Sequence, residues 1–130
     1  PILCVGETAE QLDEGASGAV VAEQLESGIK DVAVDARFTI AYDPAWTTIG
    51  KAPPVPPRHI ANVCGYLREA LASFTSVEVA KQVRIIFGGS VTTRSIGDIV
   101  KQPEIDGVLV GSASLRTDDF VTITRTMANR

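Results

Sequence analysis

The stretch Ala41-Tyr42-Asp43-Pro44-Ala45-Trp46 begins as an apolar strand and runs directly into acidic and small residues. The same pattern returns about forty residues later as Ile85-Ile86-Phe87-Gly88-Gly89-Ser90-Val91, and again as Val108-Leu109-Val110-Gly111-Ser112-Ala113-Ser114-Leu115. Parallel α/β folds place ligands and chemistry where such strands end. The three stretches therefore predict a parallel α/β fold with its site at the carboxyl ends of the strands.

Apolar periodicity extends this pattern into four strand-helix units. Strands are expected at 2–5, 38–42, 83–87 and 107–110, because each is a short apolar run of the kind that a parallel sheet buries on both faces. Helices are expected at 17–30, 57–74 and 94–100, followed by a last helix with Phe120, Ile123 and Met127 on one side. Thr8 and Gln11 have the spacing of a capping box. Alternating units of this kind favour right-handed crossovers within one domain, residues 1–130.

The connection 43–57 differs from the others because it is long and carries five prolines. Proline is tolerated in the first turn of a helix but not in its interior, so the next helix is expected to begin near Pro57. Connections of about a dozen residues are uncommon in compact domains unless they serve a function. The segment is therefore interpreted as a functional loop or lid.

Composition narrows the class of protein. The chain has 45% apolar and 22% charged residues, which suits one globular domain, and its net charge of −4 without a basic run argues against nucleic-acid binding. No apolar stretch is long enough to cross a bilayer and no leader precedes Pro1, so a cytoplasmic location is expected. Cys4 and Cys64 are expected to be buried free thiols, and with His59 as the only histidine there is no metal-ligand spacing.

The three strand ends, together with Cys4-Val5-Gly6-Glu7-Thr8, resemble the second half of the triosephosphate isomerase family along nearly the whole chain. The resemblance implies strands five to eight of the barrel, that is, half of a TIM (β/α)8 barrel. It also implies interconversion of D-glyceraldehyde 3-phosphate and dihydroxyacetone phosphate, a step of glycolysis and gluconeogenesis, without a metal or organic cofactor. A closed barrel needs roughly 250 residues, so a chain of 130 residues supplies only half of one.

Two groups of site residues follow. Small residues at strand ends let backbone N–H groups approach an anion, and a helix that begins there adds partial positive charge. In the family, the positions of Ser90, Gly111 and Ser112 hold the substrate phosphate, with an amide of the lid near Ile49 or Gly50. Asp43 matches the family's general base, which is a glutamate there. A buried carboxylate can serve as a base near neutral pH, although Asp43 could instead cap a turn or pair with a cation.

The lid region departs from the family pattern. Pro44, Trp46 and Lys51 match the hinges, but the segment is one residue shorter before the lysine and lacks the first glycine of the tip. Phe87 stands where the family has a tyrosine that latches the closed lid. Together with the shorter base, these changes suggest a divergent member with altered substrate or reduced activity.

Other residues have lesser roles in this interpretation. Glu7 is a supporting residue in the family, His59 is expected to face solvent, and Arg84 is expected to pair with a carboxylate at the barrel rim. The family's histidine electrophile and its N-terminal lysine come from strands that this chain does not contain, so the isolated chain is expected to be inactive.

The expected partners are therefore a phosphorylated triose and the missing N-terminal half barrel, in cis or in trans; a homodimer of half barrels is the alternative. Four parallel strands in a row would otherwise leave two unpaired edges and an exposed apolar face. Two further functions stay open: an isomerase of a larger phosphosugar such as a tetrulose phosphate, and a non-catalytic phosphate-binding module.

Overall fold

A computed structural model of the chain describes residues 1–47 and 53–130. Its four strands are β1 (Ile2–Val5), β2 (Thr39–Tyr42), β3 (Arg84–Gly88) and β4 (Gly107–Leu109). They form one parallel sheet in the order β1-β2-β3-β4, so each strand pairs with the next strand along the chain. The parallel α/β architecture with four strand-helix units is confirmed. The predictions for Ile49, Gly50 and Lys51 lie outside the described residues.

Helices alternate with the strands along the chain, as the periodicity predicts. They are α1 (Ala9–Asp13), α2 (Ser17–Ile29), α3 (Pro57–Phe74), α4 (Val77–Gln82), α5 (Ile96–Ile99) and α6 (Thr117–Ala128), with 3-10 turns η1 (Ala45–Thr47) and η2 (Ser112–Leu115). The expected Thr8–Gln11 capping box begins α1, and Pro57 begins α3. Helix α4 was not predicted; the Ser76 side chain caps it by accepting from the Val79 amide.

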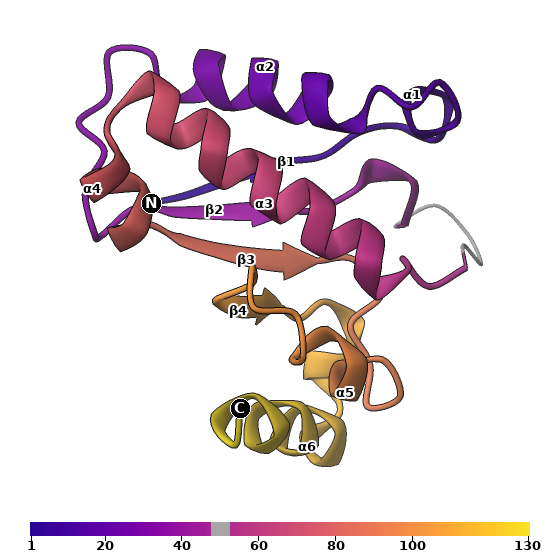
Figure 1. Cartoon of the computed structure of the whole chain (residues 1–130). Helices are drawn as coiled ribbons and strands as arrows, with labels where there is room; N and C mark the ends of the chain where they lie inside the picture. Colours follow the sequence, from indigo (N-terminus) through magenta and orange to yellow (C-terminus); the bar gives the residue numbers. More distant parts are fainter. Residues whose placement is uncertain (48–52) are drawn as a thin grey trace.

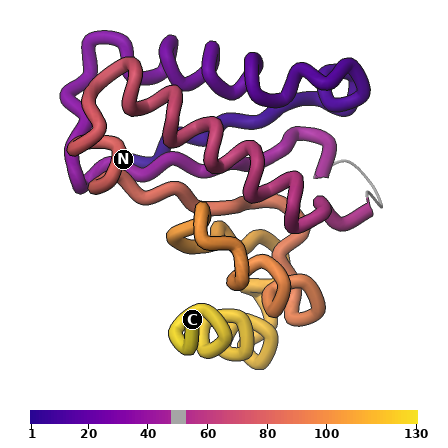
Figure 2. Tube along the Cα trace, viewed as in Figure 1, coloured from indigo at the N-terminus to yellow at the C-terminus, as the bar shows by residue number. Residues whose placement is uncertain are grey.

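The core lies between one face of the sheet and the helices α2 and α3, which run side by side over β1, β2 and β3 in Figures 1 and 2. Alternate strand residues point into this layer, and the largest of them are fully buried. The strand and helix residues that meet there include Ile40, Tyr42, Ile85, Phe87, Leu25, Ile60, Leu67 and Leu71. Helix α6 lies apart from this layer, beyond β4 (Figure 1), and packs through Ile123 while Phe120 is half-exposed.

The opposite face of the sheet and its two edges are less covered. Ile2 is 56% exposed and Cys4 is also exposed, both on β1. The expectation of a buried thiol is therefore wrong for Cys4 and confirmed for Cys64, because Cys4 points to the face that lacks helices. Within the described ranges, β1 and β4 each pair with only one strand. None of the described helices is long and apolar enough to cross a membrane.

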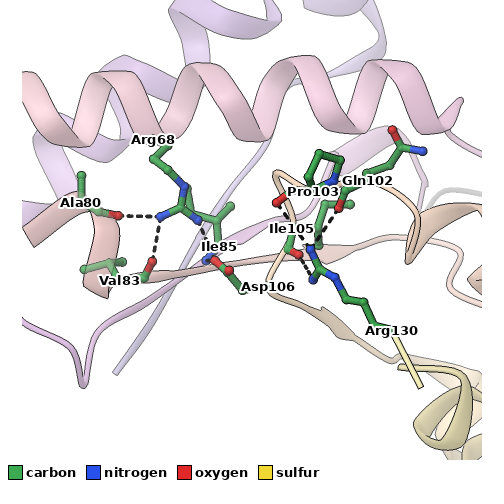
Figure 3. Close-up of polar contacts among 9 residues, drawn as sticks. All are labelled: Arg68, Ala80, Val83, Ile85, Gln102, Pro103, Ile105, Asp106 and Arg130. Carbon is green, nitrogen blue, oxygen red and sulfur yellow. Dashed lines mark hydrogen bonds and ion pairs between the residues drawn. The ribbon is translucent and has the colours of Figure 1, made fainter. Parts of the chain in front are cut away.

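An arginine joins the amino-terminal end of the sheet to its helices (Figure 3). Arg68 of α3 donates to the carbonyls of Ala80 and Val83 at 2.5 and 3.0 Å, and to the Asp106 carboxylate at 2.6 Å. The same Asp106 oxygen accepts from the Ile85 amide at 2.8 Å. Arg130 donates in the same region to the carbonyl of Ile105. Asp106 thus ties α3 to β3 at the start of β4.

We expect Asp106→Ala to lower the free energy of unfolding by about 2 kcal/mol, because it removes two hydrogen bonds that involve a charged group. Asp98→Ala is the control, since Asp98 forms an ion pair with Lys101 in which both side chains are largely exposed. That change should cost about 0.5 kcal/mol or less. Urea denaturation of both variants measures the difference, and equal losses would contradict a structural role for Asp106.

Candidate functional site

The carboxyl ends of all four strands meet at one edge of the sheet. The register aligns Val5 with Tyr42, and Tyr42 with Phe87, so the next residues, Gly6, Asp43 and Gly88, lie beside one another. The Asp43 amide donates to the Val5 carbonyl at 2.8 Å, which extends the alignment by one residue. This edge is where the predicted site residues belong.

Asp43 lies between two glycines that leave it no spare room. A Cβ at Gly6 would lie 2.2 Å from the Asp43 carbonyl oxygen, and a Cβ at Gly88 would lie 2.9 Å from the Asp43 Cγ. The side chain is half-buried. No hydrogen bond or ion pair from another described residue reaches its carboxyl group, so the cap and ion-pair interpretations have no support in the described ranges. Burial raises the pKa of Asp43, which favours proton uptake.

The turn after β3 is tightly shaped. Gly89 has φ +96° and Ser90 has φ +50°, both in the left-handed region that favours glycine. A Cβ at Gly89 would lie 2.6 Å from Oγ1 of Thr47, a buried residue whose hydroxyl donates to the Pro44 carbonyl at 2.8 Å. The turn after β3 therefore packs directly against the turn after β2, and Ser90 is exposed beside it.

The turn after β4 lies next along the same edge. The register pairs Gly88 with Leu109, which places Gly111 beyond the sheet on the side of Ser90. Gly111 and Ser112 are exposed, and Ser112 begins η2. The amide N–H groups of Ser90, Gly111 and Ser112 have no acceptor among the described residues. They are thus available to an external acceptor such as an anion.

A buried carboxyl group, that of Glu7, lies at the end of this edge that follows β1 and binds several neighbouring residues. Glu7 is 0% exposed, and its Oε1 accepts from the Tyr42 hydroxyl at 3.0 Å and the Trp46 indole at 3.1 Å. Its carbonyl accepts from the Ala45 amide at 3.0 Å. Its Oε2 is buried without a partner in the described ranges. Glu7 therefore holds the segment that directly follows Asp43.

His59 joins this group, so the expectation that it faces solvent is wrong. Its Nε2 lies 3.0 Å from the Tyr42 hydroxyl and 3.5 Å from Glu7 Oε1, and its side chain is 25% exposed. Burial first, and then the Glu7 carboxylate, raise the pKa of Tyr42 far above its usual range, so Tyr42 keeps its proton. A signal for this contact was present in the sequence, because His59 lies beside Ile60 and four residues before Val63 on the buried face of α3.

Two further residues, Cys64 and Arg84, also bear on the sequence predictions. Burial raises the pKa of Cys64 to about 12, despite the opposing effect of Arg68, so this thiol is not a nucleophile at neutral pH. Arg84 is exposed and forms no ion pair with any described residue, contrary to the expected rim pair. Across residues 1–47 and 53–130, no three His, Cys, Asp or Glu side chains gather as metal ligands.

Comparison with known proteins gives a consistent match. A family model described as triosephosphate isomerase matches residues 1–127. Among curated triosephosphate isomerases, the chain is 43% identical over 127 residues to that of Streptomyces avermitilis, covering 96% of the chain and 49% of the relative. It is 40% identical over 127 residues to that of Carboxydothermus hydrogenoformans, covering 96% and 50%, and 39% identical over 125 residues to that of Nocardia farcinica, covering 95% and 48%. The chain spans about half the length of these relatives.

We expect Asp43→Asn to stabilise the fold more at pH 7 than at pH 3. Because burial raises the pKa of Asp43 in the folded state, folded protein holds this proton to higher pH than unfolded protein does. The wild-type stability from this group is therefore complete below the unfolded pKa and declines as pH rises through the raised pKa. Asparagine is neutral throughout and avoids the decline. Urea midpoints of variant and wild type across this pH range provide the measurement.

The matched control is Asp35→Asn, because Arg37 hydrogen-bonds the Asp35 carboxylate and lowers its pKa to about 2. Stability from Asp35 is present above its unfolded pKa and is lost as pH falls, so this variant should lose stability at neutral pH instead of gaining it. A difference between wild type and Asp43→Asn that does not change with pH would contradict the burial of Asp43.

Proposed function

Because the chain belongs to the triosephosphate isomerase family, we propose that it forms the half of an aldose-ketose isomerase site that carries the base and the phosphate cradle. The substrates are D-glyceraldehyde 3-phosphate and dihydroxyacetone phosphate, the pair that the family interconverts. One observation carries this proposal: a half-buried carboxyl group and three backbone amides, none with a hydrogen-bond partner among the described residues, share one sheet edge.

Asp43 has the role of general base. The reaction moves a proton between two adjacent carbons through an enediol, so the base must accept a proton from one carbon and return it to the other. A carboxyl group with a raised pKa is better matched to that exchange at neutral pH than an ordinary surface aspartate. Aspartate is one methylene shorter than the family's glutamate, and a misplacement of about 1 Å can cost on the order of 100-fold in rate.

The amides of Ser90, Gly111 and Ser112 bind the phosphate. Backbone amides hold an anion without a nearby lysine or arginine cluster, which suits a chain with a net charge of −4. Ser90 also lines a cavity of about 500 Å³, to which Arg94 contributes one cation and Asp98 one carboxylate. Phosphate at this end and Asp43 at the other would hold the two reacting carbons between them.

The electrophile that polarises the carbonyl comes from an upstream half. The only histidine of this chain, His59, lies on α3 and not at a strand end, and it is hydrogen-bonded to Tyr42. The exposed face and single-neighbour edges of β1 and β4 are suited to further parallel strands. We therefore assign the upstream half, in the same polypeptide or a second one, as the partner. A cytoplasmic setting is part of this proposal, as is assembly into dimers.

The activity test combines this chain with the upstream half of a relative, such as that of Streptomyces avermitilis. We expect the chain alone to show no isomerase turnover and the purified complex to show it. In the complex, Asp43→Asn should lower kcat by on the order of 100-fold or more, whereas Asp43→Glu restores the family's base and should retain or raise the rate.

Turnover by the chain alone that scales with its concentration and survives re-purification would contradict the need for an upstream half. A complex that binds phosphate but turns over neither triose phosphate nor a tetrulose phosphate would replace catalysis with a phosphate-binding role. Faster turnover of the tetrulose phosphate would instead support the same general base acting on a larger substrate.

We expect Ser112→Pro to weaken binding of inorganic phosphate to the complex by about tenfold, because one amide donor is worth about 1.4 kcal/mol to an anion. Proline is tolerated at the first position of a helical turn, so this change removes the N–H with little distortion of η2. Ser112→Ala is the control, since it removes the hydroxyl and keeps the amide. Calorimetric titration measures both variants, and equal affinities would show that the amide does not contact phosphate.

A further inference from the structure

The hydrogen atoms of the Glu7 cluster, defined as Glu7, Tyr42, Trp46 and His59, can be counted. The Tyr42 hydroxyl lies 3.0 Å from Glu7 Oε1 and 3.0 Å from His59 Nε2, but it carries a single hydrogen. The Trp46 indole can only donate, and it donates to the same Glu7 oxygen. The cluster therefore needs one more hydrogen on either Nε2 of His59 or the carboxyl group of Glu7.

Two arrangements satisfy these contacts. In the first, Tyr42 donates to an ionised Glu7 and Nε2–H of His59 donates to the Tyr42 oxygen. In the second, Tyr42 donates to a bare Nε2, and Glu7 must carry a proton so that it can donate to Tyr42. The second arrangement needs one proton more than the first when the imidazole is neutral in both. The cluster therefore adopts the first arrangement when it carries the fewest protons.

We propose that His59 is a positioning residue, held as the Nε2–H tautomer by Tyr42, which fixes Glu7 and through it Trp46 at the start of the segment after Asp43. Its remaining ring nitrogen, Nδ1, carries no hydrogen in this arrangement. Nε2 also lies 3.5 Å from Glu7 Oε1, the oxygen that accepts from the Trp46 indole.

The surroundings of His59 leave few competing charges. Glu7 after β1 and Tyr42 of β2 face the ring directly. On the solvent side the ring lines a cavity of about 340 Å³, to which the α1–α2 segment contributes only uncharged residues. Tyr66 is the other titratable residue that lines this cavity. The exposed Arg58 precedes His59 in α3. Tyr42 and Glu7 are therefore the polar groups through which His59 acts on Trp46.

The consequence for the site follows from the geometry around Glu7. Its carboxyl group holds Trp46 and its carbonyl holds Ala45, so it binds both residues of the segment that leaves Asp43 after Pro44. Without the Nε2–H donor of His59, Tyr42 and Glu7 are less firmly held, and Glu7 in turn holds the Trp46 indole less firmly. The effect on catalysis rests on the proposed function, whereas the tautomer and its link to Trp46 do not.

The chain offers two unique probes, because it contains one histidine and one tryptophan. Nitrogen-15 correlation spectra of the 130-residue chain at high pH should show Nε2 protonated and Nδ1 bare. A protonated Nδ1 with a bare Nε2 at high pH would overturn the proposal.

Substitutions separate positioning from simple packing. In His59→Gln an amide can still donate to Tyr42, so the Trp46 indole should stay protected from hydrogen exchange. His59→Leu keeps similar volume without a donor, and indole exchange should become about tenfold faster, as expected for one lost hydrogen bond. Thermal melts confirm that each variant is folded. If indole exchange is the same in both variants, His59 does not position Trp46. None of these readouts needs isomerase activity, so they can fail or succeed independently of the proposed function.

Discussion

The parallel register is the constraint on which the rest of the structure depends. Since Val5, Tyr42 and Phe87 share one level of the sheet, the residues that follow them must also meet, and side chains from distant parts of the sequence become neighbours. Asp43 then requires glycine on both sides, because a Cβ at Gly6 or Gly88 would collide with it. A shift of one residue in any pairing would turn these side chains to the other face.

The site edge divides into two chemically different halves. Around Gly89, Ser90, Gly111 and Ser112 the side chains are small and the backbone supplies the polar groups. Around Glu7 the polar groups are mainly side chains: Glu7 Oε1 accepts from Tyr42 and Trp46, whereas its Oε2 has no partner in the described ranges. Asp43 lies between the two halves without a partner among the described residues. A carboxyl group in that position is free to exchange a proton while its neighbours stay fixed.

Much of this architecture could be predicted from the sequence. Strand ends were placed well because each apolar run stops at glycine or aspartate, and Pro57 and the Thr8–Gln11 box marked helix starts. The exposed Cys4 and the bonded His59 were mispredicted for a shared reason. Periodicity predicts that a residue lies on a strand or in a first helical turn. Whether its side chain is buried depends on which other elements pack against it. Cys4 lies on the face of the sheet without helices, and His59 on α3 contacts Tyr42, which lies on β2.

The order of the strands also determines how the chain can fold. Every strand pairs with its immediate successor, so each pairing closes over a single intervening connection. Loop-closure entropy grows only slowly with the length of the connection, and pairing with the next strand closes a shorter loop than pairing with a later strand would. The four units can therefore assemble in the order in which they leave the ribosome, each using the previous strand as a template. Within the described ranges β1 and β4 each keep one edge without a neighbouring strand, so these two edges are the places where the sheet can still be extended.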